Sequence, residues 1–165
     1  VARCGTFEGS EFTYTGALRI LKTMLSYDYL WINLRVKGGA YGCMSGISRS
    51  GEGYFVSYRD PNLEKTNEVY EGMPAYIENF DADEREMTKY ILGTINELDQ
   101  PKTNMDKLNA AINKFYKNIS DESVIRQRQE ILQTTAQDIR DCYELLKLIT
   151  CKNICTIGKI FMATS

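Results

Sequence analysis

The glycine pair Gly38-Gly39 marks the place where the hydrophobic period of the chain changes, and this change limits the fold more than any other feature. Before the pair, apolar residues recur at spacings of three and four over residues 14–36, which predicts helix. After it come two β-prone runs, Tyr41–Arg49 and Tyr54–Tyr58, joined by a turn rich in serine and glycine. Those runs predict a hairpin. Glycine adopts positive φ at low cost, so the pair is a natural helix end.

Helical spacing resumes after the hairpin. Asp60-Pro61 is predicted as a helix N-cap followed by proline at the first helical position. We expect Gly72 and Pro74 to kink or break that helix. Asp83, with Glu86 three residues later, is a capping box. Further helices are expected from Pro101 to about Tyr116, from Ser120 to about Leu132 and from Ala136 to Ile149 after a Thr135 cap, with strands over residues 1–7 and 153–159.

This order of elements predicts an α+β fold, in which several helices pack on one face of a small, mostly antiparallel sheet. The 165 residues fit one domain, 1–165, and contain neither an internal repeat nor a linker. The chain starts at Val1 rather than at methionine and enters as though in mid-strand. We therefore expect an excised piece of a longer protein.

The chain has no histidine, and this excludes several kinds of active site. A His-Glu-His zinc site, a Ser-His-Asp triad and a Cys-His pair all require that residue. We expect no metal bound by this chain. Its 20 basic and 22 acidic residues give a net charge of −2, which offers no electrostatic reason to expect nucleic acid or an anionic membrane as partner. No apolar run approaches the length of a membrane-spanning helix.

The five cysteines are expected to be reduced, mostly buried thiols of an intracellular protein. Cys151 and Cys155 lie four residues apart in a stretch that resembles a strand. There they would share a face without being neighbours, so we do not expect a metal site. The others are Cys4, Cys43 and Cys142.

The segment Arg35–Gly42 carries the most chemical information. An arginine near a helix end and a tyrosine at a strand start would extend from the two arms of one glycine turn. A guanidinium donates several hydrogen bonds to carbonyls or carboxylates, and a phenol can donate to a developing oxyanion. The plainer alternative is that Arg35 forms an ion pair at the helix end and Tyr41 fills the sheet edge. A phosphate loop is excluded, because Gly-Lys-Ser/Thr is absent and no helix follows.

A second segment, Ser57–Asn62, ends the hairpin and begins the next helix. Capping explains its Asp60, Pro61 and Asn62. Arg59 is either functional or part of a surface ion pair, and the ion pair is the preferred interpretation.

Several segments occur in the order and spacing of one family: Leu30-Trp31 with Leu34–Gly42, Ser57–Leu63 with Thr66 and Tyr70, Met87-Thr88-Lys89 with Gly93-Thr94-Ile95, and Arg128 with Glu130-Ile131-Leu132. Together they resemble the final domain of the presequence-protease branch of the pitrilysin/insulin-degrading-enzyme superfamily. The resemblance covers nearly the whole chain, and residues 101–117 follow it only loosely. It implies the fold of the homologous domains in pitrilysin and mitochondrial-processing-peptidase-like metallohydrolases.

The resemblance implies the C-terminal domain of a four-domain zinc metalloendopeptidase that degrades short unfolded peptides. Zinc would be the parent's cofactor, bound through His-x-x-Glu-His in another domain, and this piece alone would be inactive. Tyr41 would stabilise the oxyanion, Arg35 would bind the substrate backbone, and Gly38 and Gly39 would position the two. The partners would be the preceding domains of the same chain and the peptide. The location would be the cytoplasm of a bacterium or the lumen of a mitochondrion or plastid.

An alternative from another class is an inactive superfamily member that serves as a peptide-binding or structural assembly module. In that case no partner domain would carry the zinc motif, and Tyr41 would be dispensable.

Overall fold

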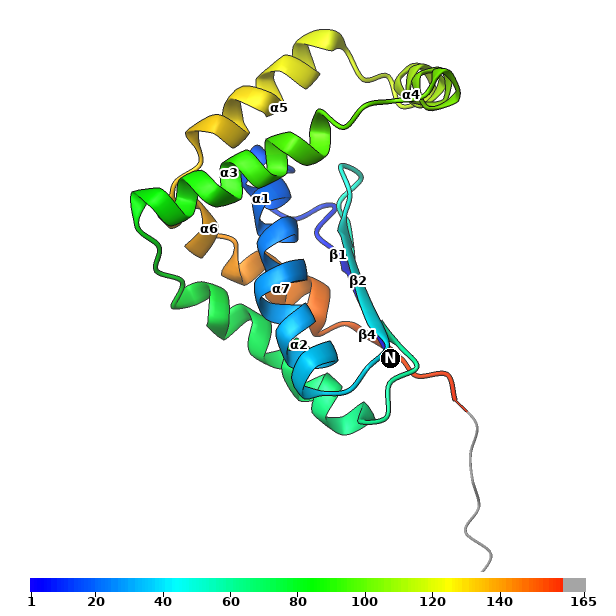
Figure 1. The fold of residues 1–165 in the computed structure, drawn as a ribbon, viewed down its shortest axis with the longest axis vertical. Coiled ribbons are helices and arrows are strands. Elements are labelled where there is room, and N and C mark those ends of the chain that lie inside the picture. The colour runs from blue at the N-terminus through cyan, green and yellow to red at the C-terminus, as the bar shows by residue number, and fades with distance from the viewer. Residues whose placement is uncertain (159–165) are drawn as a thin grey trace, which may run out of the picture.

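An antiparallel sheet with helices on one of its faces forms the part of the chain that the computed structural model describes, residues 1–158 (Figure 1). In chain order the elements are β1 (Ala2–Thr6), α1 (Gly16–Met24), the π-helix η1 (Leu25–Lys37), β2 (Gly42–Ile47), β3 (Glu52–Tyr58), α2 (Leu63–Glu78), α3 (Glu84–Leu98), α4 (Asn104–Tyr116), α5 (Asp121–Gln133), α6 (Ala136–Arg140), α7 (Tyr143–Thr150) and β4 (Asn153–Cys155).

The sheet has the strand order β2-β3-β1-β4, and every neighbouring pair is antiparallel. The predicted hairpin is β2 and β3, with Gly42 opposite Tyr58 and Ile47 opposite Gly53. The first strand lies between that hairpin and the last strand, so Ala2 faces Val56 on one side and Cys155 on the other. The expected α+β architecture is confirmed.

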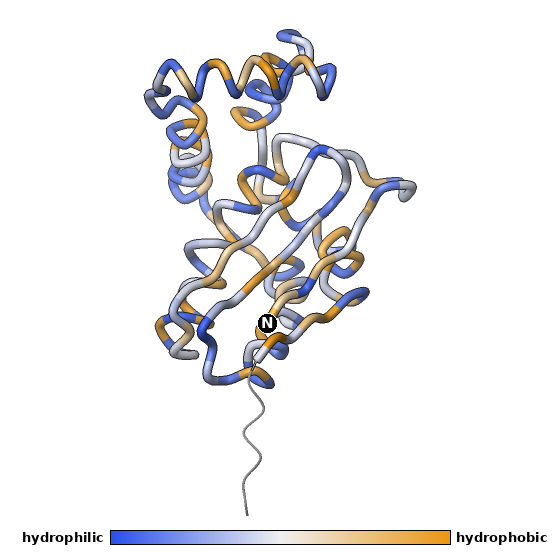
Figure 2. Tube along the Cα trace, turned by 90° about the vertical axis from the view of Figure 1, so that its right-hand side faces the viewer, coloured by the Kyte–Doolittle hydropathy of each residue, from blue (hydrophilic) through white to orange (hydrophobic). Residues whose placement is uncertain are grey.

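Alternation along the strands separates a covered face of the sheet from an open one. In β3, Phe55 and Ser57 are buried, whereas Tyr54 and Tyr58 are exposed. Successive side chains of a strand point to opposite faces, so the buried pair faces the helices and the two tyrosines face away from them. Figure 2 looks onto this open side, which no helix covers within the described residues.

The core lies between the covered face and helices α1, η1, α2 and α7. One buried charge links three of these elements. Arg3, 3% exposed, lies on the covered face of β1. Its guanidinium donates to Asn67 at 3.0 Å and Glu71 at 2.6 Å on α2, and to the carbonyl of Thr150 at 3.0 Å at the end of α7. A buried guanidinium requires such partners, so Arg3 fixes α2 and α7 against the sheet.

The helical segment before the glycine pair forms as predicted. The α1 helix continues into η1, which ends at Lys37, directly before Gly38-Gly39. The second half is π-helical, with hydrogen bonds between residues five apart, a distinction that the spacing of apolar residues did not supply. Leu30 and Leu34 keep it in the core.

The start of α2 differs from the prediction. Asp60 and Pro61 precede the helix, which begins at Leu63. The carboxylate of Asp60 accepts from the backbone N–H of Asn62 at 2.9 Å and from the hydroxyls of Ser57 and Thr66, each at 2.6 Å. Asp60 therefore connects β3 to α2 instead of capping the helix. The helix does not break at Pro74 but continues to Glu78.

The predicted starts of α3 and α5 are confirmed, and that of α4 is shifted. Asp83 and Glu86 form the predicted capping box of α3, and Ser120 caps α5. The helix start predicted at Pro101 lies three residues before α4, whose cap is Thr103.

The predicted helix over residues 136–149 is wrong in one respect, because it consists of two helices. Thr135 caps α6 as expected, but α6 ends at Arg140 and α7 begins at Tyr143. The apolar period hides the break, since Ile139 before it and Leu146 after it are both fully buried. The last strand is shorter than predicted and ends at Cys155, and the final predicted residue, 159, lies outside the described residues.

The expectation of mostly buried thiols is also wrong. Cys142 is buried and Cys43 is half-buried, but Cys4, Cys151 and Cys155 are exposed. Cys4 lies on the open face of β1, and Cys151 ends α7 rather than sharing a strand with Cys155. These thiols are exposed because they lie on the open sheet face or near the end of the chain. The local sequence pattern does not predict which face of the sheet is left open.

Candidate functional site

A tight turn joins the end of η1 to the start of β2, and its backbone explains both glycines. The N–H of Gly39 donates to the carbonyl of Arg35 at 3.1 Å, and that of Ala40 donates to the carbonyl of Leu34 at 2.9 Å. Gly39 has φ +78°, which side chains rarely adopt. A Cβ on Gly38 would lie 2.5 Å from the carbonyl oxygen of Leu34. Larger residues at either position would change the direction in which Arg35 and Tyr41 leave the turn.

The loop between β3 and α2 holds this turn from the other side. The side-chain amide of Asn62 donates to the carbonyl of Gly38 at 2.7 Å. The N–H of Tyr41 donates to the carbonyl of Arg59 at 3.3 Å. Arg59 itself has φ +48°, a left-handed conformation that is uncommon for a residue with a side chain. Residues distant in sequence therefore fix Tyr41 directly before β2, which begins at Gly42 and not at Tyr41 as predicted.

Arg35 lies in the last turn of η1 and is exposed. Its guanidinium carbon lies 4.0 Å from the ring centroid of Trp31, one turn earlier. Among residues 1–158 no carboxylate comes within ion-pair distance of it, so the ion pair considered as an alternative does not form there. Stacking on an aromatic face leaves the planar N–H groups of arginine available to another ligand.

Tyr41 lies directly before β2 and is 61% exposed. Its ring centroid lies 5.7 Å from that of Tyr58, at 59°, and 5.0 Å from the guanidinium carbon of Arg59. Its hydroxyl has no hydrogen-bond partner within the described part of the chain. The phenol is thus held by its ring while its O–H group remains available.

The open face beside Tyr41 is aromatic. The ring of Tyr58 lies over Gly42 and that of Tyr54 over Gly46, where a Cβ would overlap each ring. Two glycines in β2 therefore let two tyrosines of β3 lie flat across the sheet. Met44, 54% exposed, lies between the two glycines in sequence.

The pKa values of two groups near the turn, the Cys43 thiol and the Asp60 carboxyl, are shifted. Burial raises the pKa of the Cys43 thiol, and the charge of Arg35 partly opposes that shift. Burial also raises the pKa of Asp60, but hydrogen bonds from Ser57, Thr66 and the Asn62 backbone outweigh this effect, so its pKa lies below the usual range. Asp60 is therefore ionised at neutral pH and stabilises the loop that holds Tyr41.

Among the described residues, one cavity lies away from the turn and a second adjoins it. The second has a volume of about 780 Å³, and its lining includes Tyr58, Arg59, Pro61 and Leu63. Tyr58 and Arg59 also contact Tyr41. A ligand bound at Tyr41 could extend along the open face into this cavity.

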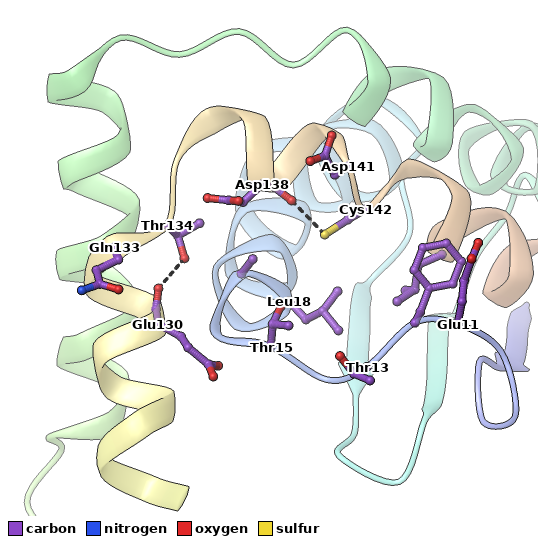
Figure 3. A pocket seen from close by; sticks show the side chains of 13 residues that line it. Glu11, Thr13, Thr15, Leu18, Glu130, Gln133, Thr134, Asp138, Asp141 and Cys142 are labelled. Atoms are coloured by element: carbon purple, nitrogen blue, oxygen red, sulfur yellow. Dashed lines mark hydrogen bonds between the residues drawn. The ribbon is translucent and has the colours of Figure 1, made fainter.

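The other cavity, of about 620 Å³, lies between the start of α1 and helices α5, α6 and α7 (Figure 3). No residue of the glycine turn lines it. Its acidic side chains include Glu130, which accepts from the N–H of Gly16 at 2.9 Å and so caps α1. Burial raises the pKa of the Cys142 thiol there to about 12, and Asp141 and Asp138 add to the shift. That thiol stays protonated at neutral pH and donates to the Asp138 carbonyl.

Two residues of the site were not identified as such from the sequence. Arg59 was interpreted as part of an ion pair, but it lies over Tyr41, and no carboxylate pairs with it among residues 1–158. Trp31 was noted only for the resemblance. Its spacing of four from Arg35 on a helix was a usable signal for stacking.

Metal ligands do not gather within the described residues: no three histidine, cysteine, aspartate or glutamate side chains lie together in a way that could hold an ion. Over the same residues, no helix has both the length and the hydrophobicity needed to cross a membrane.

Comparison with known proteins identifies a family and several relatives in sequence and structure. The family model described as the PreP C-terminal domain matches residues 1–160. "Protein HypA" of Clostridium perfringens is 43% identical over 159 residues, covering 96% of this chain and 16% of that protein. "Presequence protease 1, chloroplastic/mitochondrial" of Arabidopsis thaliana is 31% identical over 155 residues, covering 93% of this chain and 14% of that protein.

Two solved structures share the fold at low sequence identity. Pitrilysin superposes with a TM-score of 0.61 at 16% identity, covering 87% of this chain and 16% of that one. The periplasmic protease PqqL from Escherichia coli gives 0.59 at 19% identity, covering 90% and 17%. The present chain thus spans only 14–16% of the length of the two sequence relatives.

Proposed function

The chain belongs to the family of PreP C-terminal domains, and on that basis we propose that it is the non-catalytic, substrate-holding C-terminal domain of a zinc-dependent metalloendopeptidase that degrades short unfolded peptides. The proposal extends to a whole parent protein, because the relatives named as presequence proteases are several times longer than this chain. Those names support a parent in the lumen of a mitochondrion or plastid, and for a bacterial parent we propose the cytoplasm.

One observation carries the proposal. Arg35 and Tyr41 extend from the two arms of one rigid turn, both exposed, and their hydrogen-bond donors have no partners within the described residues. Unfolded peptides present many backbone carbonyls, and these two side chains are donors of the right kind.

The residues of this chain do not fit a zinc site. The sequence contains no histidine, and the described residues hold no cluster of three or more ligating side chains. The proposal therefore assigns zinc to another domain of the parent. The partners of this domain would be those preceding domains and the peptide, and the isolated chain would not hydrolyse peptides.

The proposed chemistry of this chain is electrostatic. The phenol of Tyr41 donates a hydrogen bond to the scissile carbonyl, and that bond strengthens as the oxygen becomes an oxyanion. Such a donor lowers the barrier because it binds the transition state more strongly than the substrate. Arg35 donates to a neighbouring carbonyl or carboxylate of the peptide backbone and so contributes to substrate binding.

The test uses the intact parent and a short unstructured peptide. Tyr41→Phe is expected to lower kcat by ~10²–10³, the usual loss for one oxyanion donor, with KM little changed. Arg35→Gln is expected to act mainly on KM. The matched control is Tyr54→Phe, which removes the hydroxyl of another exposed tyrosine on the open sheet face. An unchanged kcat in Tyr41→Phe would contradict the proposal and support a peptide-binding or assembly module without catalysis.

A further inference from the structure

We infer that Arg59 is a positioning residue for Tyr41, holding both its ring and its backbone in the orientation that the proposed reaction uses. The inference rests on the proposed function of Tyr41. Its evidence is a set of contacts that come from a loop distant in sequence.

The first contact is with the ring. The guanidinium carbon of Arg59 lies 5.0 Å from the ring centroid of Tyr41, within the range of a cation–π interaction. Tyr58, the residue before Arg59, provides a second ring 5.7 Å away. An exposed tyrosine otherwise rotates freely about its side-chain bonds, so these two neighbours restrict the direction of its hydroxyl.

The second contact is with the backbone. The carbonyl of Arg59 accepts the N–H of Tyr41 at 3.3 Å, directly beyond the Gly42–Tyr58 pair that ends the β2/β3 ladder. On the C-terminal side of Arg59, Asp60 fixes the loop to α2, and Asn62 fixes it to Gly38. The loop that carries Arg59 and the turn that carries Tyr41 therefore form one unit.

The conformation of Arg59 indicates that its side chain is needed. At φ +48° a glycine or an asparagine would be favoured. Residues other than glycine that adopt this left-handed backbone conformation cluster at active sites and ligand-binding sites. Arg59 has no ion-pair partner among residues 1–158 that would explain it. Its contact with Tyr41 is the explanation that remains.

The test is a double-mutant cycle in the intact parent. Arg59→Gly and Arg59→Asn remove the cation while suiting the left-handed backbone, so both are expected to fold. Each should lower kcat about two- to fivefold, the range of a cation–π contact at an exposed site. Arg59→Lys, which keeps a cation, should recover most of that loss. In the Tyr41→Phe background, Arg59→Gly should cause no further loss.

The matched control is Arg49→Asn. Arg49 also lies over a tyrosine, 5.9 Å from the ring centroid of Tyr14, but it belongs to the β2/β3 turn region. That variant should leave kcat unchanged. Thermal unfolding of each variant checks the fold.

Each other outcome identifies which idea fails. An Arg59→Gly protein with unchanged kcat overturns the inference, as does an equal loss in the native and Tyr41→Phe backgrounds. In both cases the function of Tyr41 stands. If Tyr41→Phe alone leaves kcat unchanged, the proposed function fails instead, and the inference fails with it.

Discussion

Helices α2 and α4 carry similar apolar patterns but differ completely in burial. In α2, Tyr70, Met73 and Ile77 are fully buried against the sheet and its neighbours. In α4 no residue is buried, although apolar residues recur at spacings of three and four along it. These residues are Met105, Leu108, Ile112 and Phe115. An apolar period therefore identifies which side of a helix is hydrophobic, but not whether anything covers that side.

Position explains the difference between the two helices. The α2 helix packs against η1 and α7, which lie on the covered face of the sheet, whereas α4 extends past the end of the sheet, beyond α3 and α5 (Figure 1). The stability of α4 depends more on local signals, above all the capping box of Thr103 and Asp106. Isolated helices of this length are marginal in water, so α4 should be the less stable of the two.

The largest expected effect comes from deleting the same atoms in both helices. Ile77→Ala should lower the free energy of unfolding by about 3 kcal/mol, because Ile77 is fully buried and its loss leaves a cavity. Ile112→Ala should change it by less than ~1 kcal/mol, because Ile112 is 43% exposed and alanine favours helix. Urea denaturation of both variants checks the pair. Equal losses would mean that α4 is packed as firmly as α2.

A second prediction concerns how closely the core elements approach. A Cβ on Gly5 would lie 2.7 Å from the Cα of Ile149, so α7 packs directly on the backbone of β1. Backbone atoms cannot move aside as a flexible side chain can. Gly5→Ala should therefore lower the free energy of unfolding by about 1–3 kcal/mol. A variant as stable as the native chain would show that α7 can shift away from the sheet without cost.

Local signals in the sequence predicted the parts of the fold that depend on neighbours in the chain. The glycine pair ended η1, and Asp83, Ser120 and Thr135 each capped a helix as expected. Failures occurred where distant packing decides. Asp60 has the composition of a cap, but its carboxylate bonds to Ser57 and Thr66 across the loop instead.

The candidate site divides in the same way. Arg35, Gly38, Gly39 and Tyr41 belong to one short segment, so the turn could be predicted, and their functional roles remain predictions. The contact between Tyr41 and Arg59 requires the register of β2 against β3. The hydrophobic pattern fixes a register only where one face of a strand is clearly apolar, and the glycine-rich β2, Gly-Cys-Met-Ser-Gly-Ile, has no such face.

Asp60 gives a pH-dependent test of the loop that holds the site. Its pKa is lowered in the folded state, so it stabilises the fold above the pKa of an unfolded aspartate, ~3.9. That stabilisation is lost as the pH falls through the folded-state pKa. Between pH 7 and pH 3 the native chain should therefore lose more stability than Asp60→Asn. Urea unfolding at both pH values measures the difference, and parallel losses would mean that Asp60 contributes nothing.

The smallest expected effect is a gain, and it lies in the outer helices. Gly93 is in the middle of α3, and a Cβ there would meet no atom within 4 Å. Alanine at a helix interior is favoured over glycine by up to ~1 kcal/mol, mainly because it restricts the unfolded chain. Gly93→Ala should thus raise the free energy of unfolding, the opposite sign to Gly5→Ala, although the substitution is the same. If urea denaturation instead shows a loss, the surface of α3 at Gly93 is covered, and the outer helices are packed more like the core than their exposure indicates.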